Sequence, residues 1–128
     1  AYNTTKSSSF YYSYNRGSDS ANNFQVSTNN DLAQSTNFQD IAYNTNVDNY
    51  SSMSGCLYIF NPSSTTFVKH FISTTNDEAQ TSGEQGLSQV CYVGGYFNTT
   101  SAVDAIRFQF NSGNMDSGTI KLYGIKDS

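Results

Sequence analysis

The sequence predicts an all-β domain, an antiparallel β-sandwich, from its composition, the short period of its apolar residues and its frequent turn residues. Serine, threonine and asparagine number 20, 13 and 15 among 128 residues, whereas charged residues make up only 12%. Tyrosine (10) and phenylalanine (9) supply the large apolar side chains. Tyr, Phe and Thr favour strands, and Asn, Ser and Gly favour turns. Because no segment keeps a helical period for three turns, we expect short strands separated by polar turns.

The first expected strand is Ser9–Tyr14, in which Phe10, Tyr12 and Tyr14 share one face. The residues after it contain Asn and Gly, which tolerate positive φ, and therefore predict a turn. Three further segments are assigned from their apolar content. After the turn over 15–19, they are a short strand over 24–26, a polar loop over 27–37 and a weak strand candidate over 38–43.

The middle of the chain carries clearer strand signals. Cys56–Phe60 is a continuous apolar run, which predicts a strand buried on both faces, and Asn61–Pro62 ends it because proline cannot donate to a ladder. Phe67–Ile72 is the next expected strand. Thr74–Gly86 is expected to be an acidic loop, and Ser88–Phe97 a strand in which two glycines mark a bulge or a close backbone approach.

The C-terminus has the strongest strand signal of the sequence. In Val103–Phe110, every second residue from Ile106 onward is large and apolar. Residues 111–118 predict a turn. Thr119–Ile125 predicts a second strand, in which apolar residues again lie at alternate positions. We therefore expect a closing hairpin, which must belong to a larger sheet because two strands alone are marginally stable.

Length and charge limit the possible classes of protein. A chain of 128 residues without internal repeats predicts one domain over residues 1–128. Its net charge is −4, and its six basic residues are scattered, so no nucleic-acid partner is expected. No apolar run approaches the roughly 18 residues of a transmembrane helix, so no membrane insertion is expected. Because the chain begins with Ala rather than Met, we expect either a removed Met or a longer N-terminal part.

The residue types that carry catalysis are sparse. His70 is the only imidazole, and no G-x-S-x-G element accompanies it, so a strand histidine is expected. Glu78 and Glu84 fall in one polar loop, which does not predict the separated carboxylates of a glycosidase. Cys56 and Cys91 are expected as buried free thiols, with a disulfide between two sheets as the alternative. We therefore expect no enzyme, no cofactor and no zinc site.

Two kinds of ligand remain as alternatives. Clustered oxygen ligands for calcium would come from Asp31, Asp40 and Asp48, or from Asn114 and Asp116 in the turn over 111–117, but the alternating spacing of a calcium loop is missing. A sugar-binding surface would use exposed tyrosine rings, with Asn and Asp to bind hydroxyl groups. The candidate rings are those of Tyr11, Tyr43, Tyr50 and Tyr96.

Several segments of the chain resemble virion proteins of tailed bacteriophages. The C-terminal part is similar to their pattern of an "A-I-x-x-I" strand, an "S-G-N" turn, an "S-G-T" restart and a final "L-Y-G-I". Two upstream segments are similar to an "N-G-D-S-G-x-N-Y" element, here interrupted by Arg16, and to an "I-x-I-P-N" element, here with Asn before Pro. The segments are Thr100–Phe108, Ser112–Met115, Ser117–Ile120, Leu122–Ile125, Asn15–Phe24 and Leu57–Pro62.

The resemblance implies a β-sandwich of jelly-roll type on the external surface of a virion, assembled in the host cytoplasm, and it brings no catalytic residues. The expected function is a capsid decoration or cement protein, working as a homotrimer against other virion proteins such as the capsid protein. Its contacts would come from apolar residues on the second faces of strands, namely Val68, Ile72, Tyr123 and Ile125. The alternative is a tail-fibre module that binds a receptor or host-surface glycan with exposed tyrosines in loops, and with the loops over 28–37 and 74–86 grouped at one end of the sandwich.

Overall fold

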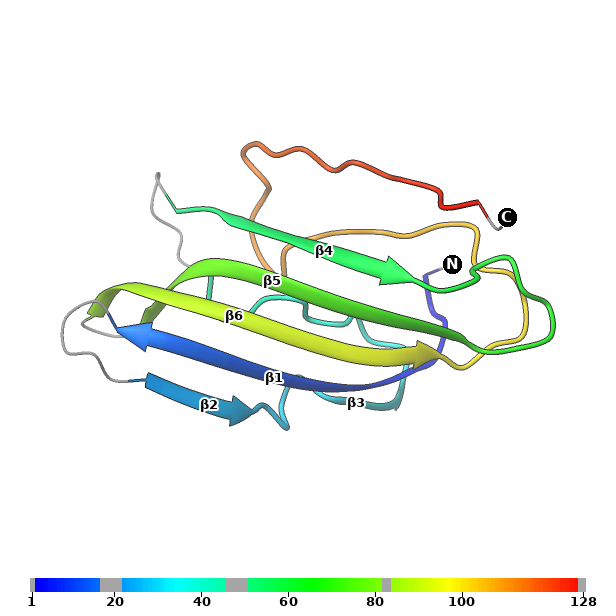
Figure 1. Ribbon diagram of the computed structural model, residues 1–128, viewed down its shortest axis with the longest axis horizontal. Helices are drawn as coiled ribbons and strands as arrows, with labels where there is room; N and C mark the ends of the chain where they lie inside the picture. The colour runs from blue at the N-terminus through cyan, green and yellow to red at the C-terminus, as the bar shows by residue number, and fades with distance from the viewer. Residues whose placement is uncertain (1, 17–21, 46–50, 82–83, 127–128) are drawn as a thin grey trace.

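The computed structural model describes residues 2–16, 22–45, 51–81 and 84–126. Six strands form one antiparallel sheet in the order β2-β1-β6-β5-β4, and β3 pairs with the N-terminal part of β1, on the edge that β2 also uses (Figure 1). The strands are β1 (Lys6–Arg16), β2 (Asn22–Val26), β3 (Leu32–Ser35), β4 (Met53–Ile59), β5 (Lys69–Thr81) and β6 (Glu84–Phe97). The described ranges contain no helix that is long and apolar enough to cross a membrane.

The all-β class is confirmed, and the architecture is an open antiparallel sheet. No second packed sheet is found among the residues that the structure describes. The long strands β1, β5 and β6 form its centre, and their side chains alternate between two faces as the strand period requires. Along β5 this alternation is regular, with every second residue from Phe71 to Ala79 buried.

The core lies on one face of the sheet, here called the inner face. Its buried apolar residues are Phe10, Phe71, Cys91 and Val93. The segment over residues 38–45 covers them, and the ring of Tyr43 meets that of Phe10 edge-on at 6.5 Å between centroids. The expected strand over residues 38–43 is therefore wrong, because this segment crosses the inner face as irregular chain.

Polar side chains of β5 hold the covering segment in place. Thr75 Oγ1 donates to the carbonyl oxygen of Ile41 at 2.6 Å, and Thr45 Oγ1 donates to Asp77 Oδ2 at 2.7 Å. A single β-bridge pairs Thr45 with Ala79. The expectation of an acidic loop over Thr74–Gly86 is therefore wrong. Residues 74–81 belong to β5 and residues 84–86 to β6, because partners in the covering segment bind the polar side chains of β5 that face the core.

Three smaller expectations change at the sheet's edges. β4 is an edge strand rather than a strand buried on both faces, and Cys56 and Tyr58 are exposed. The expected loop over 27–37 contains β3. Cys56 pairs with Thr74 and Cys91 with Thr75, so the two cysteines lie on opposite faces of the sheet; both are free, and only Cys91 is buried.

Gly95 is the position where two strands and a ring meet most closely. A Cβ atom there would lie 2.8 Å from Phe71 Cζ and would also collide with the backbone oxygen of Ser7. The β6 register continues without a shift through both glycines on its β1 and β5 sides. Of the two expectations for this glycine pair, the close backbone approach is confirmed and the bulge is wrong.

The expected C-terminal hairpin is not formed, since no strand follows Phe97 in the described part of the chain. Lys69 Nζ donates to the carbonyl oxygens of Thr99 (3.0 Å) and Ser101 (2.6 Å), and Val103 N donates to the Pro62 oxygen at 2.8 Å. Residues 104–126, here called the C-terminal arm, are exposed throughout. Alternation of apolar residues predicts a strand only where a sheet edge is available, and no edge of this sheet pairs with the arm.

Candidate functional site

The face of the sheet opposite the core, here called the outer face, carries an exposed row of aromatic and aliphatic side chains. The pairing register places them, because residues paired across strands point to the same side. One row across the five strands is Cys56, Thr74, Tyr92, Tyr11 and Val26, and the next row contains Tyr58, Ile72, Gly94 and Ser9. No element of the described chain is paired or packed over these rows.

Two groups of rings lie on the outer face. Tyr11 stacks on Tyr92 with 5.3 Å between ring centroids and 18° between planes, and it also meets Phe24 at 5.4 Å. The second group consists of His70 and Tyr96, whose ring centroids are 6.1 Å apart. His70 is thus an exposed strand residue, as expected.

Gly94 leaves an opening between the two groups. It lies two residues from Tyr92 and two from Tyr96 on the same face of β6, with Ile72 and Ser9 on the neighbouring strands. A Cβ at this glycine would meet nothing within 4 Å. The arrangement is a small gap bordered by aromatic rings, which suits an apolar side chain or the face of a sugar ring.

The inner face holds the titratable groups that burial perturbs most. Asp77 accepts from Thr45 Oγ1 and, at 3.3 Å, from Gln89 Nε2, while burial raises the pKa of its carboxyl group. Burial, with a smaller contribution from the nearby Asp77 charge, raises the pKa of the Cys91 thiol to about 11. A thiol with so high a pKa stays protonated and weakly nucleophilic at neutral pH. This cluster holds the covering segment to the sheet.

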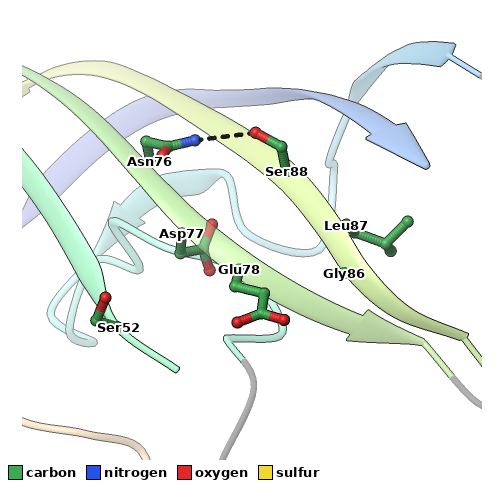
Figure 2. Close-up of a pocket in the computed structure, with 7 residues that line it drawn as sticks. All are labelled: Ser52, Asn76, Asp77, Glu78, Gly86, Leu87 and Ser88. Carbon is green, nitrogen blue, oxygen red and sulfur yellow. Dashed lines mark hydrogen bonds between the residues drawn. The ribbon is translucent and has the colours of Figure 1, made fainter. Parts of the chain in front are cut away.

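A shallow hollow of about 350 Å³ lies where β5 and β6 approach their shared turn (Figure 2). Asp77 and Glu78 border the hollow. Because they are neighbours on β5, their side chains point to opposite faces of the sheet. The Glu78 carboxylate accepts from Ser51 Oγ at 3.3 Å. These two carboxylates therefore do not face each other across a substrate. Its remaining border consists of Ser52, Asn76, Gly86, Leu87 and Ser88.

The expected interaction residues do not form one site. Tyr11, Tyr96 and Ile72 share the outer face, whereas Tyr43 packs on the core, so its assignment as an exposed ring is wrong. Val68 is half-buried just before β5, and Tyr50 lies outside the described residues. The two C-terminal candidates are among the most exposed large side chains, at 77% for Tyr123 and 89% for Ile125.

Metal ligands are not gathered either. Within the described ranges, no three His, Cys, Asp or Glu side chains come together as a metal site requires. Asp31 Oδ1 accepts the backbone N–H of Phe10, and Asp40 Oδ2 accepts from Asn30 Nδ2 at 2.7 Å. Asp48, the third residue of the expected calcium group, lies outside the described residues.

Tyr92, Phe24 and Gly94 belong to the outer face but are not among the interaction residues expected from the sequence. The period-2 spacing of Tyr92, Gly94 and Tyr96 in one strand was the available signal. Their grouping with Tyr11 depends on the β1–β6 register, which the sequence does not state. No family model, no curated protein and no solved structure matches this chain.

Proposed function

We propose that this chain is a non-enzymatic structural subunit of a larger assembly, most specifically a capsid decoration or cement protein on the outside of a tailed-bacteriophage particle. The observation that supports an assembly role is the amount of exposed surface. The chain exposes 9054 Å². A compact monomer of its 14.1 kDa exposes about 6,700 Å², so about 2,300 Å² is left over.

Part of the exposed surface consists of large apolar side chains. The outer face exposes Tyr58, Ile72 and Phe24, and the C-terminal arm exposes further large apolar side chains. Exposed apolar side chains that gather on one face of a soluble protein mark interaction sites, whereas single scattered ones do not. A standard protein interface removes about 800 Å² from each partner, so the surface left over suffices for contacts with more than one neighbour.

The resemblance to tailed-phage virion proteins supplies the location. A chain with only 12% charged residues and many Ser, Thr and Asn forms contacts that salt screens little, which suits a particle exposed to a changing medium. We propose a homotrimer bound to the capsid protein, in which the open sheet is completed to a jelly-roll sandwich.

The Gly94 gap supports a second candidate, a receptor- or glycan-binding module of a tail fibre. In this reading a sugar ring stacks between the Tyr11–Tyr92 pair and the His70–Tyr96 pair. The expected binding loops are not its basis, because 74–81 belongs to β5 and the rings lie on strands.

Quantitative mass spectrometry of purified particles tests the first candidate. The chain should be present at a fixed ratio to the major capsid protein, and particles assembled without it should lose their genome at a lower temperature. Absence from purified particles contradicts the proposal. Saturable binding to a glycan array that Tyr92→Ala abolishes and Ser13→Ala preserves would favour the second candidate.

A further inference from the structure

The C-terminal arm combines a strong strand pattern with complete exposure. Its distal part, Thr119–Ile125, includes Ile120, Leu122 and Ile125, which are 65%, 96% and 89% exposed. The proximal part is held more closely, since the Arg107 guanidinium lies 5.6 Å from the Phe38 ring centroid. The distal arm is therefore the apolar, strand-forming segment without a partner in the described chain.

The edge strand β4 is the complementary feature. Phe60 N donates to the His70 oxygen at 2.9 Å, and main-chain groups alternate sides along a strand. The N–H and C=O groups of Gly55, Leu57 and Ile59 consequently point away from β5, toward the open edge. The seven residues of β4 include no charged residue and no proline, the usual devices that protect a free edge.

Direction favours a second copy over the chain's own β4. Figure 1 shows the last described residues running in the same sense as the β4 arrow. Pairing within one chain would thus add a parallel strand to a sheet in which every pairing is antiparallel. A neighbouring copy in the trimer can present its β4 in the opposite sense to the arm, and the new pair is then antiparallel.

From these features we infer that the distal arm of one copy adds as an antiparallel strand to the β4 edge of a second copy. Each copy both gives an arm and receives one, so the association closes into a symmetric oligomer. Main-chain hydrogen bonds supply the pairing, and alternate arm side chains enter the apolar surface beside Cys56 and Tyr58. This inference rests on the assembly role proposed above and names the contact that builds it.

Native Cys56 offers a direct test, because it lies in β4 and is exposed. Four full-length variants carry Cys56→Ser together with Ile120→Cys, Lys121→Cys, Leu122→Cys or Tyr123→Cys. Each is mixed with the unmodified chain, oxidised mildly and analysed by peptide mass spectrometry. We expect a disulfide from Cys56 of the unmodified chain to alternate positions of the arm, the signature of a strand. Cys56→Ser with Asn111→Cys, in the connection before the distal arm, is the matched control and should not cross-link.

A size measurement on the isolated protein accompanies the cross-linking. Leu122→Asp should raise the dissociation constant of the oligomer at least tenfold. The neighbouring Lys121→Asp should leave the mass of the oligomer unchanged. Cross-links at none of the four positions would overturn the inference. Because the cross-linking uses isolated protein, a negative result there does not contradict the presence of the chain in purified particles. Absence of the chain from particles likewise does not contradict the arm–β4 contact.

Discussion

Truncating Phe10 to alanine tests whether the inner face is the core that stabilises the sheet. Phe10 is fully buried in β1, opposite Val93 in β6 and beneath the Tyr43 ring. Phe10→Ala removes roughly 150 Å² of apolar contact, which at about 25 cal/mol per Å² corresponds to about 4 kcal/mol. Measured Phe→Ala losses in cores are about 3–5 kcal/mol. Small domains are stable by only about 5–15 kcal/mol, so the variant should be marginally folded.

Urea unfolding followed by far-ultraviolet circular dichroism measures this loss. The chain has no tryptophan, so tyrosine fluorescence serves as the second probe. Ser9→Ala is the control, because Ser9 precedes Phe10 and points to the outer face, and we expect it to change stability by less than about 0.5 kcal/mol. If Phe10→Ala costs no more than Ser9→Ala at equal protein concentration, the assignment of the core is refuted.

Three further measurements test separate parts of the structure. Gly95→Val should destabilise the sheet by more than about 2 kcal/mol, because its Cβ collides with the Ser7 backbone, whereas Gly94→Val should be nearly neutral on the open face; equal losses in unfolding would contradict this. Since burial raises the pKa of Asp77, the wild type should lose stability relative to Asp77→Asn as pH rises from about 4 toward 7, and a pH-independent difference would contradict this. A thiol reagent should modify Cys56 at once and Cys91 only after unfolding, and equal rates would show that Cys91 is not buried.

The sequence located several strands in which large apolar residues alternate. β1, β2, the end of β4 before Asn61–Pro62 and most of β6 follow the expected segments. It failed over residues 74–81, where Thr75 and Asp77 face the core. Their burial depends on partners from residues 41–45, about thirty positions away, and a local pattern cannot reveal them.

The C-terminal segment is the second region in which the prediction from sequence is wrong. Ile120 and Leu122 have the alternation of a strand, yet no strand among the described residues pairs with this segment. Alternating apolar residues indicate that a segment can form a strand, but they do not indicate which chain provides the neighbouring strand. The outer face is similar, because Tyr11 and Tyr92 were apparent as tyrosines, but only the register stacks one on the other.

Hydrogen–deuterium exchange at low and high protein concentration tests the assembly account most directly. If the distal arm pairs with β4 of a second copy, the backbone amides of Thr119–Ile125 and those of Gly55, Leu57 and Ile59 on the open edge of β4 should become protected together as the protein concentration and the measured mass rise. Exchange of the arm at the rate of an unstructured peptide, with a monomeric mass at every concentration, would contradict it.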